Sequence, residues 1–147
     1  MTEKIFIACD HGGLELKKSL KSLLESQNIQ VEDLGTNSTE SVDYPALAHN
    51  LCKKIVATDD TIGILICGTG IGMSIAANKN KGIRAALCSE SYSAKMARLH
   101  NDANVLCLGG RVVGANLALD IVTAFLKTSF EGGRHQRRVD MLDPDQL

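Results

Sequence analysis

The stretch Ile62-Gly63-Ile64-Leu65-Ile66-Cys67-Gly68-Thr69-Gly70-Ile71-Gly72-Met73-Ser74 decides the fold of this chain. Its short apolar run is typical of a buried strand, a glycine-rich turn follows, and a helical pattern opens after the turn. This order places the thiol of Cys67 beside backbone N–H groups at the N-terminus of a helix. Such a position stabilises anions and lowers the pKa of a thiol. We therefore expect Cys67 to act as a base or a nucleophile.

The same alternation of strand and helix extends along the chain. Apolar runs predict strands at Lys4–Cys9, Ile29–Leu34, Ile62–Cys67, Ile83–Cys88 and Asn104–Leu108. Apolar residues at helical spacing predict helices over 16–24, 45–55, 70–79, 90–100 and 117–125. Strands that alternate with helices predict the α/β class: a single Rossmann-like three-layer domain with a five-stranded parallel sheet covered on both faces.

The length of 147 residues is that of one domain, so we expect residues 1–147 to form a single unit, with 130–147 as a basic C-terminal tail. The tail contains the polar segment Glu131-Gly132-Gly133-Arg134-His135-Gln136-Arg137-Arg138, which lacks apolar periodicity. A solvated terminus is the ordinary interpretation of such a segment. Its glycines and its basic and imidazole side chains also fit a local anion site, on the same subunit or on a neighbour.

The composition argues against several classes of partner. The formal net charge is -1, so no strong field favours nucleic acid or a membrane surface, and aromatic residues make up only 3%. No apolar stretch approaches the roughly 20 residues that span a bilayer. Met1 to Lys4 leads directly into a predicted strand and lacks the apolar region of a signal peptide. We expect a cytoplasmic protein that binds neither nucleic acid nor membrane.

The chain has five cysteines, namely Cys9, Cys52, Cys67, Cys88 and Cys107. Their odd number and the lack of C-x-x-C spacing argue against zinc ligation and a disulfide framework. Free thiols fit a reducing cytosol. Four of the cysteines are expected to be small packing residues, and Cys67 is set apart by the turn that follows it.

Polar and glycine residues follow several predicted elements. The first strand ends in Cys9-Asp10-His11-Gly12-Gly13, the fifth in Gly109-Gly110-Arg111, and the helix after the fourth strand in His100-Asn101-Asp102. Each residue has a simpler interpretation: a helix cap for Asp10, a loop imidazole for His11 and a favourable C-terminal cation for His100. Because ligands bind at the carboxyl ends of strands in open α/β sheets, we expect these groups to converge with Cys67 at one edge.

Two familiar glycine motifs do not fit. Gly68-x-Gly70-x-Gly72 differs from G-x-G-x-x-G, follows the third strand, and has no acidic residue at a ribose-binding strand end. The glycine loop also lacks the Lys-Ser/Thr pair that ends a P-loop. A nucleotide site is therefore disfavoured, and an amide-rich cradle beside a thiol remains.

Taken together, these motifs resemble the type B ribose-5-phosphate isomerase family, which also includes allose-6-phosphate and galactose-6-phosphate isomerases. The segments that carry the resemblance are Asp10-His11-Gly12-Gly13, Cys67-Gly68-Thr69-Gly70-Ile71-Gly72, His100-Asn101-Asp102, Gly110-Arg111-Val112-Val113-Gly114 and Glu131 to Arg138. They run from the first strand to the basic tail and so cover nearly the whole chain.

The resemblance implies that ribose 5-phosphate and ribulose 5-phosphate are interconverted through an enediolate, without a cofactor or a metal. It implies that Cys67 is the base and that the Thr69 hydroxyl helps to pass a proton between the substrate oxygens. Donors must face the enediolate oxygens. The expected donors are the N–H groups of Gly68, Thr69, Gly70, Ile71 and Gly72.

The resemblance also implies roles for the remaining motif residues. His100 would open the sugar ring, since an imidazole titrates near neutral pH. Asp10 would orient a hydroxyl or assist this step, and Asn101 would bind sugar hydroxyls. The expected phosphate ligands are His11, Arg111, Arg134 and Arg138. A homodimer or a dimer of dimers is implied, in which the basic tail or the His100 segment reaches the site across the interface.

Two alternatives stay open at this point. A related enzyme acting on a six-carbon sugar phosphate would differ in pocket length, which the sequence does not give. A flavodoxin-like binding or regulatory domain, with Asp10 as phospho-acceptor, would bind phosphate or nucleotide without turnover. This second alternative leaves Cys67 and the arginines of the tail without roles.

Overall fold

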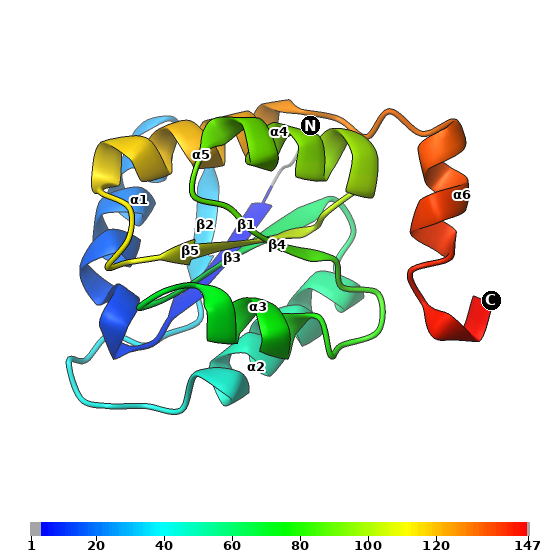
Figure 1. Cartoon of the computed structure of the whole chain (residues 1–147). Helices are drawn as coiled ribbons and strands as arrows, with labels where there is room; N and C mark the ends of the chain where they lie inside the picture. The colour runs from blue at the N-terminus through cyan, green and yellow to red at the C-terminus, as the bar shows by residue number, and fades with distance from the viewer. Residues whose placement is uncertain (1–3, 147) are drawn as a thin grey trace.

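The computed structural model describes residues 4–146, so the outermost positions of the expected domain, 1–3 and 147, lie outside the described residues. A single sheet of parallel strands in the order β2-β1-β3-β5-β4 forms the middle layer. Helices α1, α4 and α5 cover one face of the sheet, and α2 and α3 cover the other (Figure 1). The predicted α/β class with a five-stranded parallel sheet is confirmed.

The elements follow one another as expected, with one addition at the end. The strands are β1 (Lys4–Cys9), β2 (Gln30–Asp33), β3 (Thr61–Cys67), β4 (Ala85–Leu87) and β5 (Val105–Gly109). The helices are α1 (Leu14–Ser26), α2 (Tyr44–Ala57), α3 (Ile71–Ala77), α4 (Ser91–Asn101), α5 (Ala115–Lys127) and α6 (Arg134–Asp140). Short 3-10 turns lie at His11–Gly13 and Pro144–Gln146. The fourth strand is shorter than its predicted range.

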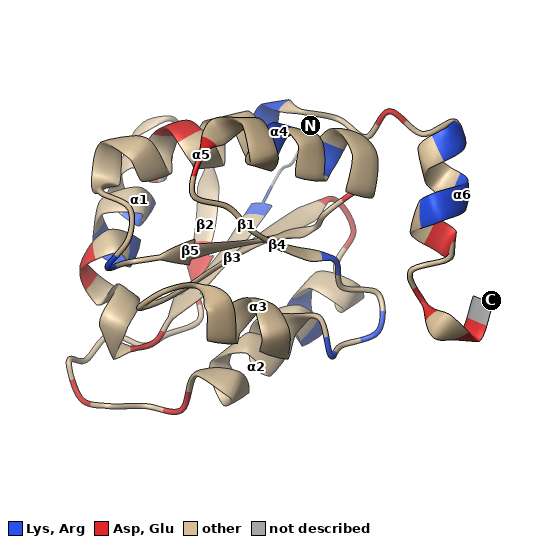
Figure 2. Ribbon diagram, viewed as in Figure 1, with Lys and Arg blue, Asp and Glu red and all other residues tan. Residues whose placement is uncertain are grey.

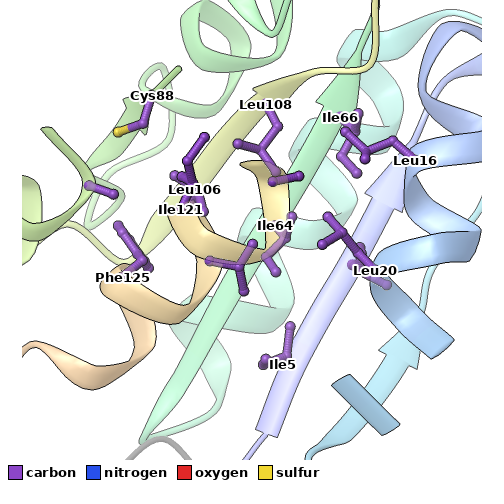
Figure 3. Packing of buried hydrophobic residues seen from close by; sticks show 14 of the residues in the cluster. Ile5, Leu16, Leu20, Ile64, Ile66, Cys88, Leu106, Leu108, Ile121 and Phe125 are labelled. Atoms are coloured by element: carbon purple, nitrogen blue, oxygen red, sulfur yellow. The ribbon is translucent and has the colours of Figure 1, made fainter. Parts of the chain in front are cut away.

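The central strand β3 shows why the apolar run is continuous. Ile62, Ile64 and Ile66 pack into the core under α1 and α5, whereas Leu65 and Cys67 pack into the core under α2 and α3. Because side chains alternate along a strand, a strand covered on both faces is apolar at every position. Figure 3 shows Ile64 and Ile66 among the labelled residues of the first of these cores.

The strand order creates a switch point between β1 and β3. From β1 the chain moves outward to β2, and from β3 it moves outward in the opposite direction to β4 and β5. Ligands of open α/β sheets bind beyond the carboxyl ends of the strands at such a point. Asp10 follows β1 and donates its N–H to the Ile66 carbonyl at 3.1 Å, so the ends of β1 and β3 are held together.

Helix α4 leads away from this carboxyl edge. A helix that joins parallel strands must return to the edge where the next strand begins. Asp102, directly after α4, contacts the Arg84 guanidinium at 3.3 Å, and Arg84 precedes β4. The last turn of α4, with His100, therefore lies at the amino edge of the sheet, as Figure 1 shows.

The tail is more ordered than its polarity predicts. Residues Arg134–Asp140 form α6, which follows the positive-φ residues Gly132 and Gly133. The tail returns to the amino edge, where the Glu131 N–H donates to the Leu99 carbonyl at 3.0 Å. Figure 2 shows Lys and Arg positions in blue along the α6 ribbon, with acidic positions in red at its end and in the loop before it. Within residues 4–146, no helix has the length and apolar character needed to cross a membrane.

Candidate active site

Cys67 ends β3 directly before the glycine loop. Its side chain lies in the core under α2 and α3, and the residue is 6% exposed. The N–H of Gly70 donates to the Cys67 sulfur at 3.2 Å. The exposed Thr69 lies between them, and its hydroxyl accepts the N–H of Ile71 at 3.2 Å. The loop therefore brings a thiol, a hydroxyl and several backbone amides to one place.

Two glycines give this loop its shape. Gly70 has φ +81, and a Cβ there would lie 2.9 Å from the carbonyl carbon of Leu108. A Cβ on Gly72 would lie 2.6 Å from the ring of Tyr44, which covers this end of the loop. A side chain at either position would push the loop away from its supports. Tyr44, the first residue of α2, is a neighbour of the cradle that the sequence analysis missed.

The other cysteines are buried, as expected. Burial raises the pKa of Cys9, Cys52 and Cys88 to about 11. The pKa of Cys107 is raised further, again by burial. These thiols remain protonated near neutral pH, and none forms a disulfide. Cys67 is therefore the cysteine whose position suits chemistry.

Asp10 and His11 lie beside the same loop. The Asp10 carboxylate accepts the Gly12 N–H at 2.8 Å and so caps the following turn, in keeping with the simpler interpretation of this residue. A Cβ on Gly12 would lie 3.1 Å from the Gly68 nitrogen, which brings this turn against the cradle. The His11 Nδ1 accepts the N–H of Val42 at 3.3 Å. The Nε2 of a neutral His11 then carries the proton and can donate to a ligand.

A buried lysine holds the loop that contacts His11. Lys17 is 1% exposed, and its ammonium contacts the Asp33 carboxylate at 2.8 Å, the Thr36 carbonyl and the Asn37 side-chain oxygen at 3.1 Å. The sequence analysis missed it, because a lysine in an amphipathic helix ordinarily faces water. Lys17 fixes the start of the segment that reaches Val42.

Arg111 is the cation nearest to the cradle in the same chain. The backbone N–H of Arg111 donates to the Gly68 carbonyl at 3.0 Å. A Cβ on Gly68 would lie 3.2 Å from the Arg111 guanidinium. The Gly110 N–H donates to the Cys67 carbonyl at 2.8 Å. The ends of β1, β3 and β5 thus bring together Asp10, His11, Cys67 and Arg111, as expected from their positions at strand ends.

The remaining expected residues lie elsewhere. His100 and Asn101 end α4, and Arg134 and Arg138 belong to α6, so all four lie at the amino edge. The prediction that the His100 segment converges with Cys67 at one edge of the same chain is wrong. The physical reason is the return direction of a helix between parallel strands. The expected site residues of one chain therefore lie in two groups at opposite edges of its sheet, and we call these groups half-sites.

The half-site at the amino edge contains a stacked imidazole pair. The rings of His100 and His135 lie 4.3 Å apart between centroids, with 14° between their planes. The fold also brings one ligand atom of each of His100, Glu131 and His135 within 4.8 Å of one another, a grouping that the sequence spacing does not reveal. Because the rings are nearly parallel, their nitrogen lone pairs do not converge on one point. The geometry favours a stacked pair over metal coordination.

Comparisons with known proteins identify the family to which this chain belongs. The family model described as Ribose/Galactose Isomerase matches residues 5–142. The chain is 50% identical over 140 residues to ribose-5-phosphate isomerase B of Escherichia coli strain K12, covering 95% of this chain and 94% of the relative.

Two solved structures extend the similarity to the backbone. The ribose 5-phosphate isomerase of Thermotoga maritima superposes with a TM-score of 0.95 at 52% identity and covers 98% of this chain and 99% of its own. The ribose-5-phosphate isomerase B of Mycoplasma genitalium, solved with bound ribulose-5-phosphate, has a TM-score of 0.93 at 47% identity and covers 99% of this chain and 97% of its own.

Proposed function

Because this chain belongs to the ribose/galactose isomerase family, we propose that it interconverts ribose 5-phosphate and ribulose 5-phosphate. The name of the Escherichia coli relative and the ligand of the Mycoplasma genitalium structure support this substrate. The observation that carries the proposal is the Cys67 sulfur at the end of β3, in contact with an amide of a glycine loop.

The proposed chemistry follows from this pairing. Cys67 removes the proton from C2 of the open-chain aldose, and the resulting enediolate carries its charge on oxygen. Backbone N–H groups of residues 68–72 stabilise that charge, and Thr69 moves the hydroxyl proton between the two oxygens. Return of the proton to C1 gives the ketose, so no atom or electron is gained from outside.

Ring opening comes first for the aldose. We assign it to His100, which donates a proton to the ring oxygen while the bond from C1 to that oxygen breaks. The C1 hydroxyl gives its proton to the Asp10 carboxylate as the carbonyl forms, so the step is balanced. In this scheme Asn101 binds sugar hydroxyls.

The two half-sites imply a shared active site. Cys67 and His100 lie at opposite edges of one chain, so a second copy must bring its amino edge to the carboxyl edge of the first. In a two-fold dimer this contact occurs twice and forms equivalent sites. The phosphate would bind His11 and Arg111 of one copy and Arg134 and Arg138 of the other, in a homodimer or a dimer of dimers. The free cysteines fit a cytoplasmic enzyme.

Turnover by the wild type and by matched cysteine variants tests the function. The wild type should form ribulose 5-phosphate from ribose 5-phosphate, and Cys67→Ala should lower kcat by about 10²- to 10⁴-fold with folding retained. Cys52→Ala is the control, because it removes a buried thiol from α2 and should keep the rate. Phosphate binding without turnover by the wild type would favour the binding-domain alternative, and preferred turnover of allose 6-phosphate would favour the six-carbon alternative.

A further inference from the structure

The segment before α6 is fixed against the last turn of α4. The Glu131 N–H donates to the Leu99 carbonyl at 3.0 Å, and the His135 N–H donates to the Gly132 carbonyl at 3.0 Å. His135 is 5% exposed, whereas His100 is half-buried and Glu131 exposed. The tail therefore delivers one buried imidazole to the face of His100.

One nitrogen of the buried His135 ring is unpaired. Its Nε2 lacks a hydrogen-bond partner, and the Glu131 carboxylate lies 3.9 Å from it, beyond hydrogen-bonding distance. A buried polar atom without a partner costs stability, so its retention calls for a reason. The parallel contact with His100, at 4.3 Å between centroids, is the interaction that remains.

Charge decides which ring carries a proton. Two imidazoles in contact cannot both be protonated without strong repulsion. Burial lowers the pKa of His135, as do His100, Arg134 and Arg138, and only Glu131 opposes them. On α4, Arg98 is paired with Asp102 at 3.2 Å. These surroundings therefore favour the neutral form of the His135 ring.

We propose that His135 is a positioning residue for His100, with its stacked neutral ring holding His100 in place and Glu131 serving as the counter-ion of the protonated His100. This inference rests on the proposed function, because it assigns His100 the ring-opening step. It adds a residue that does not touch substrate and acts through its neighbour. The amino edge then supplies one functional unit, which consists of Glu131, His135 and His100.

The contribution of this unit can be measured separately from that of the base, Cys67, because the two act in different steps. Ribose 5-phosphate reacts only after its ring opens, whereas ribulose 5-phosphate has its C5 oxygen esterified and stays open. In heavy water, enolisation of the ketose exchanges its C1 hydrogen for deuterium without ring opening. Turnover of the aldose therefore depends on His100, and exchange into the ketose does not.

The test compares both rates in His135→Ala, His135→Phe and Glu131→Gln. His135→Ala should lower kcat/KM for ribose 5-phosphate about tenfold, a part of what a general acid contributes. His135→Phe keeps a ring face and should stay within about twofold of the wild type. In Glu131→Gln, loss of the counter-ion favours the neutral form of His100, so the alkaline limb of the pH profile for ribose 5-phosphate should move to lower pH. Deuterium exchange should be unchanged in all three variants.

His49→Gln is the matched control. His49 contacts Asn80 and lies far from His100 along the chain, so this substitution should change neither rate. Unchanged aldose turnover in His135→Ala would overturn the inference, and so would equal loss of turnover and exchange, which would mark a structural role. In both cases the wild type still isomerises, so the proposed function stands. Absence of isomerisation by the wild type would remove the proposed function and this inference together.

Discussion

Cys67 differs from the other four cysteines of the chain in the groups that contact its sulfur. The N–H of Gly70 donates to this sulfur. In contrast, the thiols of Cys52 and Cys9 donate to backbone carbonyls, at 3.9 and 3.6 Å respectively. An N–H donor favours an anionic sulfur, and a carbonyl oxygen disfavours one. The N–H of Gly70 therefore distinguishes the surroundings of the Cys67 sulfur from those of Cys52 and Cys9.

This contrast predicts selective alkylation. Treated with iodoacetamide at about pH 8, the folded protein should be labelled at Cys67 alone, since only thiolates react. Cys9, Cys52 and Cys88 have a pKa raised to about 11, so their thiolates form only as the pH approaches that value. Peptide mass spectrometry identifies which cysteines carry the label. Early labelling of Cys52 with Cys67 untouched would contradict this account.

Sequence reasoning recovered the residues that stand in motifs and missed those that act through contacts. Cys67 ends a strand, Asp10 and Arg111 follow strands, and the strand order brings these three residues to one edge as expected. Tyr44 and Lys17 carry no such signal: an aromatic at a helix start and a lysine in an amphipathic helix both have ordinary surface interpretations. Their importance arises from packing between segments that are distant in the sequence, and such contacts cannot be read from one sequence.

At the scale of elements, the loop between β3 and α3 depends on close backbone contacts. Gly70→Ala places a Cβ in a positive-φ position, 2.9 Å from backbone of β5. We expect it to lower the free energy of unfolding by about 1–3 kcal/mol and to reduce kcat. Urea unfolding and the isomerase assay measure both effects.

Gly114→Ala is the control for this substitution. Nothing lies within 4 Å of its Cβ position, and its φ of -80 suits alanine. The free energy of unfolding should fall by no more than about 0.5–1 kcal/mol, because alanine is a poorer N-cap than glycine. Equal effects of the two substitutions would mean that the loop is not held as described.

The loop after β2 depends on Lys17. Lys17→Met removes the ammonium and leaves the Asp33 carboxylate and the Thr36 carbonyl without their partner. We expect a loss of about 3 kcal/mol in unfolding free energy, as for a broken buried ion pair, and a raised KM because the segment also contacts His11. Lys18→Met is the matched control, since its side chain is 59% exposed. A Lys17→Met protein with wild-type stability and KM would refute this role.

The sequence alone implies the direction of α4. A helix between parallel strands must end where the next strand begins, so His100 could have been placed at the amino edge from the predicted alternation alone. Helix α6 was harder to foresee. It has seven mostly polar residues, and its support comes from contacts with α4 rather than from an apolar stripe.

At the scale of the whole molecule, the separation of the half-sites predicts complementation between chains. Cys67→Ala and His100→Ala homodimers should both turn ribose 5-phosphate over slowly. Hybrid dimers, isolated by two different tags after co-expression, should reach about half the wild-type rate, because one of their two equivalent sites is intact. Hybrids as slow as both parents would show that each site is built from one chain.

The central claim is that the Cys67 sulfur takes the proton from the carbon next to the sugar carbonyl. Its most direct test is deuterium incorporation at C1 of ribulose 5-phosphate in heavy water, followed by NMR with wild-type protein and with folded Cys67→Ala. The account predicts rapid exchange with the wild type and a rate about 10²- to 10⁴-fold lower with the variant. Exchange at the wild-type rate in Cys67→Ala would contradict it.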